Sequence, residues 1–185
     1  MTPDAASGDL RALDALPADD IVLPTLERVA VPPGWRRTLE FPVLQMVADG
    51  VGALGPEPFG TRLTLADVPA MLELVSRAQP GPFAPRTIEL GGYVGVRHEG
   101  RLVAMAGRRV APTGWTEISG VCTHPDFRGR GHGRRLLLEV LRGIRTEGRR
   151  GFLTVLETNP ATGLYESLGF AARRRFVLAR LARER

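Results

Sequence analysis

A turn rich in glycine and arginine, Arg128-Gly129-Arg130-Gly131-His132-Gly133, is the stretch whose residue types are best suited to chemistry. Its alternating glycines allow the backbone to bend sharply and to come close to a ligand. A helix is expected to begin here, and the first N–H groups of a helix lack intrahelical acceptors and carry the positive end of the helix dipole. The Arg128–Gly133 turn therefore suits a phosphate or pyrophosphate group.

Two elements must hold this turn in place. Residues 115–123 have strand character, and the run ends before Pro125. Residues 131–147 have the spacing of an amphipathic helix, and the apolar positions that recur on one face are Leu137, Val140, Leu141 and Ile144. The sequence thus predicts a strand–turn–helix unit centred on the turn.

The rest of the pattern predicts a mixed sheet with helices on its faces. Residues 93–97 and 102–110 form a predicted hairpin, which residues 115–123 extend into an antiparallel meander. Residues 152–157 follow a helix and are therefore expected to lie parallel to 115–123. The other expected elements are strands at 21–31, 38–47 and 170–181 and helices at 10–16, 68–78, 87–90 and 160–168. Pro42 favours an edge position for its strand, because proline cannot donate to a ladder.

Composition bounds the class of protein. A chain of 185 residues, 43% of them hydrophobic, is long enough for one domain with a proper core. No apolar run approaches the roughly 18 residues of a membrane span, and the N-terminus has no signal pattern, so we expect no membrane contact and a cytoplasmic protein. The single cysteine excludes an internal disulfide.

The net charge of +5 comes from arginine alone, because the chain has no lysine. No lysine nucleophile or Walker-type phosphate loop is therefore possible. Aromatic residues make up 6% and do not alternate with the arginines, so we expect no nucleic-acid partner. The glycine spacing and the preceding meander also differ from a dinucleotide-binding βαβ unit. His98, His124 and His132 are scattered, and no metal site is predicted.

Arg128, Gly131 and Gly133 fit the R/Q-x-x-G-x-G/A pattern of the GCN5-related N-acetyltransferase superfamily. The segment Glu117–Pro125 and the downstream Leu164-Tyr165-Glu166-Ser167-Leu168-Gly169-Phe170 resemble its FR47-like branch. The resemblance spans roughly residues 60–181. It implies an α/β fold with a mostly antiparallel mixed sheet, one splayed parallel strand pair and flanking helices. We expect this domain at residues 56–185, after an N-terminal extension, residues 1–55, that no motif assigns.

The resemblance implies acetyl-CoA as the acyl donor, no metal, and direct acyl transfer to an amine. The pyrophosphate would lie on the turn, on Arg128, Gly129, Arg130, Gly131, His132 and Gly133. The pantetheine arm would pair with the strand backbone at Val121, Cys122 and Thr123, and Asn159 would touch the arm. The family's oxyanion donor corresponds to the N–H of Val121.

Acyl transfer needs an acid for the leaving thiolate and a base for the amine. Tyr165 matches the family's tyrosine and is the expected acid. Glu117 is the expected base, directly or through water, because alternation places it on one strand face with Val121 and Thr123. A local bulge would change that facing. Alternation also turns Cys122 to the opposite face, as a small buried residue and not a nucleophile.

The acceptor is the least determined part. Arg86 and Glu89 lie in the segment that helps to form the acceptor site in the family, so Arg86 is a candidate partner for a substrate carboxylate and Glu89 for an amine. A small amine or amino acid, a peptide N-terminus, and a non-catalytic acyl-CoA sensor remain open, and so do a monomer and a homodimer. Ordinary exposed loop charges are the alternative for Arg86 and Glu89.

Overall fold

The computed structural model describes residues 18–26, 30–52 and 58–184. Its strands hydrogen-bond in the order β1-β8-β2-β7-β6-β5-β4-β3 and form an eight-stranded mixed sheet with helices. The chain divides into two compact units. The smaller unit comprises residues 1–45, 155–159 and 172–185, and the larger unit comprises residues 46–154 and 160–171.

The smaller unit is built from long strands: β1 Asp20–Thr25, β2 Trp35–Val47 and β8 Ala171–Arg183. β1 pairs antiparallel with β8, and Trp35 and Leu181 form the buried core of this unit. The edge position expected from Pro42 is wrong, since β2 lies between β8 and β7. Pro42 is tolerated there because its carbonyl still accepts a hydrogen bond, 3.3 Å long, from the N–H of Glu157.

The larger unit contains the predicted meander. Its strands are β3 Thr61–Leu63, β4 Tyr93–His98, β5 Arg101–Arg108, β6 Trp115–Thr123 and β7 Arg150–Leu156. β3 to β6 pair antiparallel in sequence order, whereas β6 and β7 pair parallel. Both the meander and the parallel neighbour predicted from the sequence are confirmed.

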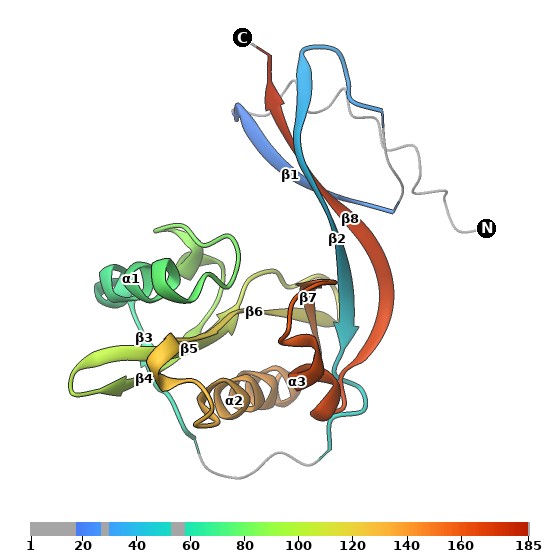
Figure 1. Ribbon diagram of the computed structural model, residues 1–185. Helices are drawn as coiled ribbons and strands as arrows, with labels where there is room; N and C mark the ends of the chain where they lie inside the picture. The colour runs from blue at the N-terminus through green and yellow to red at the C-terminus, as the bar shows by residue number, and fades with distance from the viewer. Residues whose placement is uncertain (1–17, 27–29, 53–57, 185) are drawn as a thin grey trace. The chain divides into compact units, whose positions relative to one another are not determined.

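Helices cover both faces of this meander. α1, Val68–Ala78, lies on one face of β3 to β6 and α2, His132–Thr146, on the other (Figure 1). The shorter helices are η3 Leu65–Asp67, η4 Thr87–Leu90, η5 Pro125–Phe127 and α3 Thr162–Ser167. The predicted helix at 10–16 lies outside the described residues, and so does the part of the predicted strand 21–31 at residues 27–29.

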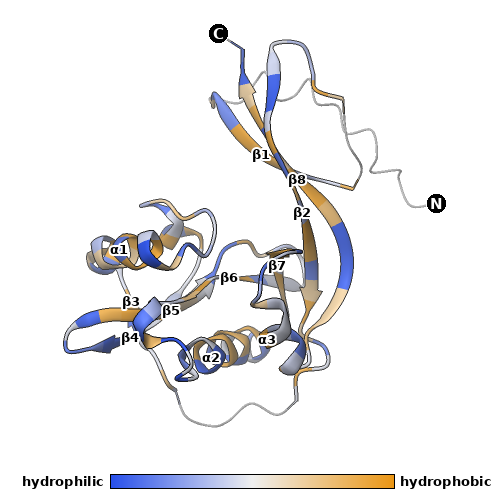
Figure 2. Cartoon of the chain, viewed as in Figure 1, coloured by the Kyte–Doolittle hydropathy of each residue, from blue (hydrophilic) through white to orange (hydrophobic). Residues whose placement is uncertain are grey.

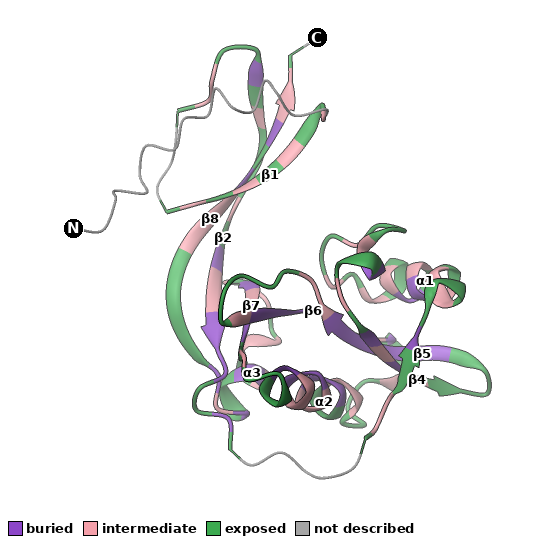
Figure 3. Ribbon diagram, turned by 180° about the vertical axis from the view of Figure 1, so that it is seen from behind, coloured by how far each residue is buried: buried purple, intermediate pink, exposed green. Residues whose placement is uncertain are grey.

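Amphipathicity fixes how α2 lies. The α2 ribbon alternates between hydrophobic and hydrophilic residues and between buried and more exposed ones (Figures 2 and 3). The buried side chains are Leu136, Leu137, Val140, Leu141 and Ile144. Burying one such side chain stabilises the fold by roughly 1.5–3 kcal/mol. Because α2 is held along its whole length, its N-terminus and the preceding turn have a fixed position.

No helix within the described ranges is both long and apolar enough to traverse a bilayer. The expected division into an extension at 1–55 and a domain at 56–185 stays a prediction.

Candidate active site

The Arg128–Gly133 turn connects β6 to α2 as predicted. Gly129 and Gly131 have φ angles of +75° and +78°, and Gly131 is the N-cap of α2. A Cβ at either position would meet nothing within 4 Å, so glycine is required there by the backbone conformation and not by crowding. The left-handed residues bring the chain out of the turn directly into helical geometry.

The first amides of α2 point out of the helix without intrahelical acceptors. The first helical hydrogen bond runs from the N–H of Arg135 to the carbonyl of Gly131, at 3.1 Å, and no side chain caps the helix. The N–H groups of His132, Gly133 and Arg134 therefore precede that ladder. An anion bound at this point would satisfy them and would also be stabilised by the helix dipole.

Two arginines of the turn, Arg128 and Arg130, directly precede these amides in the sequence. Arg128 donates to the carbonyl of Thr123 at 3.5 Å, and Arg130 donates to the carbonyl of Asp126 at 3.3 Å while lying 4.7 Å over the ring of Phe127. These contacts use only part of each guanidinium, so donors remain for a ligand. The donor set of arginine side chains and open amides fits a pyrophosphate group.

A short segment not singled out in the sequence braces the same helix end. Glu139, on α2, accepts hydrogen bonds from the N–H groups of Phe59 and Gly60, at 2.8 and 2.6 Å. The ring of Phe59 stacks on His132 with centroids 5.9 Å apart, and the guanidinium of Arg135 lies 3.5 Å from its centroid. Phe59 thus fixes the ring of the first helical residue.

The sequence-based prediction of which β6 side chains share one face of the sheet is wrong in part, because the strand contains a bulge. Met105 pairs with Cys122 but Gly107 pairs with Ser119, so β6 has one residue more than β5 between these pairs. Gly120, with φ at +62°, lies at the bulge. Glu117, Ser119 and Cys122 therefore face the α1 side together, and Thr123 faces α2.

The ring of Tyr93 underlies this bulge. A Cβ at Gly107 would lie 2.3 Å from the ring, and a Cβ at Gly120 would lie 2.9 Å from it. Two glycines on neighbouring strands thus leave the space that one tyrosine fills. The Tyr93 hydroxyl is buried and lies near Ser119. Burial raises its pKa to about 12, an effect that nearby Arg109 and Ser119 partly offset.

β6 and β7 separate soon after they begin to pair. The parallel register covers Trp115↔Arg150, Thr116↔Gly151 and Glu117↔Phe152, and it ends there. Beyond Glu117, the ladder pairs of β6 are made with β5 only. Among the described residues, the β7-side backbone edge of Val121, Cys122 and Thr123 therefore has no ladder partner and could pair with an extended ligand.

Glu117 is held by an arginine that sequence reasoning missed. Both oxygens accept hydrogen bonds from Arg109, at 2.9 Å each, and the Glu117 side chain is 4% exposed. The two residues face each other across β5 and β6, and the hydrogen bond to Glu117 raises the pKa of the Arg109 guanidinium. An arginine directly opposite a strand glutamate is the sequence signal that could have identified the pair.

Tyr165, on α3, is buried close to Cys122. Burial raises the pKa of its hydroxyl to about 12, and the nearby Cys122 thiol adds to the rise. α3 is anchored because Gly169, with φ at +94°, and Gly50 approach each other so closely that a Cβ on Gly50 would lie 2.6 Å from the Gly169 carbonyl. Tyr165 thus stays protonated at neutral pH, as an acid must.

Cys122 does not have the environment of a nucleophile. Burial raises the pKa of its thiol to about 12, so the thiolate is scarce at neutral pH. His124 is engaged elsewhere: its Nε2 lies 2.9 Å from Arg101, and its Nδ1 accepts from the N–H of Asp126 at 3.3 Å. Cys122 is a core residue packed with Met105 and Tyr93.

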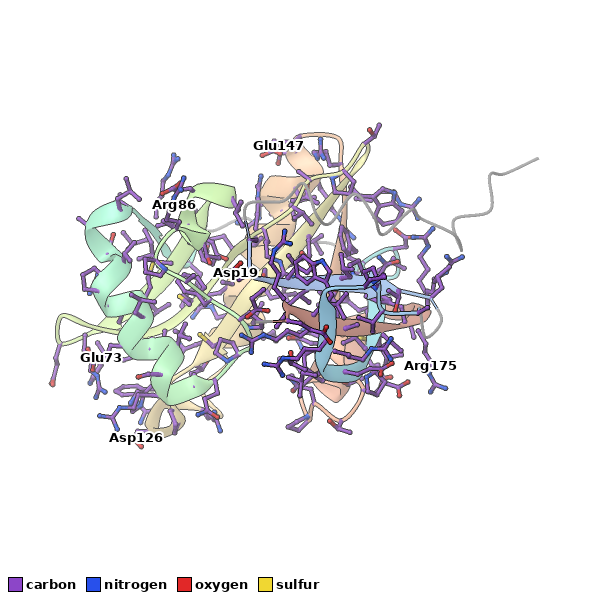
Figure 4. All side chains as sticks on the ribbon, turned by 90° about the horizontal axis from the view of Figure 1, so that it is seen from above. Asp19, Glu73, Arg86, Asp126, Glu147 and Arg175 are labelled. Carbon is purple, nitrogen blue, oxygen red and sulfur yellow. The ribbon has the colours of Figure 1, made fainter. Side chains whose placement is uncertain are left out.

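The two residues expected at the acceptor site are paired with each other. Arg86 donates to both oxygens of Glu89, at 2.7 to 3.0 Å, and its side chain is 86% exposed. Figure 4 shows Arg86 on the outside of the segment that follows α1.

Asn159, the residue expected to contact the pantetheine arm, belongs to the smaller unit, where its N–H donates to the carbonyl of Leu156 at 3.0 Å. The larger unit brings together the turn, Glu117, the β6 edge and Tyr165.

Comparisons with known proteins agree with this arrangement. Residues 93–178 match the family model described as FR47-like protein. The chain is similar to N-alpha-acetyltransferase RimI of Mycobacterium tuberculosis, with 37% identity over 124 residues, which are 58% of this chain and 75% of that protein.

Solved structures give the same result. An acetyltransferase of the GNAT family from Novosphingobium aromaticivorans superposes with a TM-score of 0.86 and 41% identity over 94% of this chain and 80% of its own. The ribosomal-protein-S18-alanine N-acetyltransferase of Escherichia coli shares the fold, with a TM-score of 0.55 and 23% identity over 68% of this chain and 94% of its own.

Proposed function

Because this chain belongs to the GCN5-related N-acetyltransferase (GNAT) family, we propose that it transfers acetyl from acetyl-CoA to the primary amine of a small molecule or amino acid. The observation that carries the donor side is the Arg128–Gly133 turn, where open helix amides and arginines meet at one point. The pyrophosphate would bind there, with Gly131 and Gly133 at its closest approach.

The open edge of β6 supports the path of the pantetheine arm. Val121, Cys122 and Thr123 would pair with it through their backbone, as an added strand pairs with a sheet edge. The bound thioester supplies an activated acyl group. The N–H of Val121, at the bulge, would donate to the oxygen on which negative charge develops.

Tyr165 is the proposed general acid. Its high pKa keeps the proton on the hydroxyl until the leaving sulfur needs it. Glu117 is the proposed general base, either directly or through water. Its two hydrogen bonds from Arg109 fix the orientation of the carboxylate, which as the base would take the proton of an arriving ammonium group.

A second acceptor class is favoured by one specific observation. The similarity to RimI, an N-alpha-acetyltransferase by name, extends over 58% of this chain and supports acetylation of a peptide N-terminus. A peptide acceptor would use the same base, acid and donor site. The two classes therefore differ only in what recognises the body of the acceptor.

Thiol release from acetyl-CoA, measured with a panel of small amines, amino acids and short peptides, tests the proposal. We expect turnover with at least one small amine or amino acid. Turnover with peptides alone would favour the RimI-like role. Tight CoA binding without turnover on any acceptor would overturn the enzyme proposal in favour of a sensor module.

A further inference from the structure

A small cavity of about 210 Å³ lies in the larger unit, where β4 begins and β5 ends. The residues that shape it are Gly91, Gly92, Arg108, Arg109, Glu147 and Arg149. A Cβ on Gly91 would lie 2.7 Å from the Arg108 carbonyl, so glycine is needed at this wall. The cavity is smaller than a typical site of 300–1,000 Å³ for a whole ligand, and it suits a single small group.

The charges at the cavity do not balance. Arg108 is neutralised by Glu147 at 2.5 Å, and Arg109 is neutralised by Glu117. Arg149 has only neutral partners in the described part of the chain: the hydroxyl of Thr116 at 2.8 Å and the carbonyls of Pro112 and Trp115 at 2.7 and 2.5 Å. Arg149 is thus a half-buried guanidinium without a carboxylate partner among the described residues, next to two guanidiniums that are paired.

The cavity adjoins the proposed base. Arg109 lines the cavity, and with Nε and Nη2 it also holds both oxygens of Glu117. Arg109 therefore links the wall of the cavity to the carboxylate that would receive the amine. Glu147, labelled in Figure 4, forms another wall at the end of α2.

We propose that the acceptor carries an oxyanion, a carboxylate or a phosphate, close to its amine, and that the cavity at Arg149 binds this group while the ammonium turns toward Glu117. The inference rests on the proposed N-acetyltransferase function. A zwitterionic acceptor matches the arrangement on both sides, because it brings a negative charge to Arg149 and a positive charge to Glu117. A peptide N-terminus lacks the nearby anion.

Matched acceptor pairs test this on the unmodified protein. Glycine, β-alanine and γ-aminobutyrate are compared with their amides, and phosphoethanolamine is compared with ethanolamine. Within at least one pair we expect kcat/KM to be roughly tenfold or more higher for the anionic member, as for a hydrogen bond to a charged group. Whether the preference appears in the amino-acid pairs or in the phosphoethanolamine pair shows whether the cavity binds a carboxylate or a phosphate. Equal rates within every pair, or a preference for neutral members or peptides, would overturn the inference while leaving the N-acetyltransferase function intact.

Three variants locate the effect. Arg149→Gln should reduce the preference roughly tenfold, mainly through KM, and Arg149→Lys, which keeps the charge, should retain most of it. Arg150→Gln removes the same charge one residue away, where the side chain pairs with Asp49 outside the cavity lining, and should leave the preference unchanged. An equal loss in Arg149→Gln and Arg150→Gln would contradict a specific role for Arg149.

If the protein turns over none of these acceptors, a binding measurement can still test the inference. Calorimetry on the CoA-loaded protein compares N-acetylglycine with N-acetylglycinamide, and O-phosphorylated N-acetylethanolamine with N-acetylethanolamine. We expect tighter binding of an anionic member, with the difference lost in Arg149→Gln. Equal affinities would overturn the inference, whereas anion-selective binding without turnover would refute the proposed function alone.

Discussion

Glu117 on β6 and Arg109, which directly follows β5, face each other and share two hydrogen bonds of 2.9 Å in a largely buried setting. The pair gives a buried carboxylate two charge-assisted hydrogen bonds and holds it in one orientation. It also leaves Glu117 beside the bulge at Gly120. The proposed base therefore depends on its arginine for its position.

Glu117→Gln keeps the size of the side chain and removes its charge. We expect kcat to fall by roughly 10²-fold, in the range typical of general base catalysis, with acetyl-CoA affinity unchanged. Steady-state kinetics and calorimetry with acetyl-CoA separate the two effects. An unchanged kcat would remove Glu117 from the mechanism.

Tyr165→Phe removes the proposed acid, and the other tyrosine of the chain provides a matched control. We expect turnover to fall by roughly 10²-fold while CoA affinity stays near that of the parent protein. Tyr93→Phe removes a buried hydroxyl that has no proposed role in the reaction and should leave turnover unchanged. Equal turnover in the parent protein and Tyr165→Phe would contradict the assignment of Tyr165.

Gly131→Asp tests the phosphate site. The added carboxylate would lie at the start of α2 and repel a pyrophosphate, so acetyl-CoA affinity should fall by more than roughly tenfold. Gly100→Asp is the control, because Gly100 also has φ at +78° and open space around a Cβ, but lies in the β4–β5 hairpin. Both variants carry a similar backbone cost of roughly 1–2 kcal/mol. Unchanged affinity in Gly131→Asp would refute the turn as the pyrophosphate site.

Gly120→Val tests the bulge. A Cβ there would lie 2.9 Å from the Tyr93 ring in a left-handed conformation, so we expect a loss of roughly 1–3 kcal/mol in the free energy of unfolding. Shifting the bulge should also lower kcat, since Val121 follows directly. Urea unfolding and kinetics at a temperature where the variant is folded measure the two effects. Full activity would show that the bulge geometry does not matter for turnover.

Alkaline stability follows from the buried thiol. Burial raises the pKa of Cys122 from 9.0 to about 12, so its contribution is complete below pH 9 and is lost as pH rises from 9 toward 12. Between pH 9 and 10 this thiol alone should lower stability by up to roughly 1.4 kcal/mol per pH unit, and the two buried tyrosines, whose pKa values are also raised, add to the fall. Urea unfolding of Cys122→Ala should show a shallower fall. Parallel slopes in the two proteins would contradict this account.

Much of the fold could be predicted because local signals agreed with the tertiary structure. The apolar stripe of α2, the hairpin around Gly100 and the glycines of the Arg128–Gly133 turn each indicate one conformation. The facing of Cys122 and Thr123 could not be predicted, because a bulge depends on pairing with β5. Pro42 was misread because an inner strand can still use the carbonyl of a proline.

The acceptor side was harder to predict, because it depends on contacts between distant residues. Arg86 looked available in the sequence but is paired with Glu89 three residues on. Arg149 follows α2 and belongs to no sequence motif. Of the arginines that line the cavity, it is the one whose hydrogen-bond partners in the described part of the chain are all neutral. Charge balance around a cavity is visible only after folding.

The most direct test of the central claim follows the acetyl group itself. The protein is incubated with acetyl-CoA labelled with a heavy isotope in its acetyl group and with an amino-acid acceptor, and both acceptor and protein are analysed by mass spectrometry. We predict label on the acceptor nitrogen, depending on Tyr165, and none on Cys122. Labelled Cys122 during turnover, or no labelled acceptor from any amine, would contradict direct acetyl transfer.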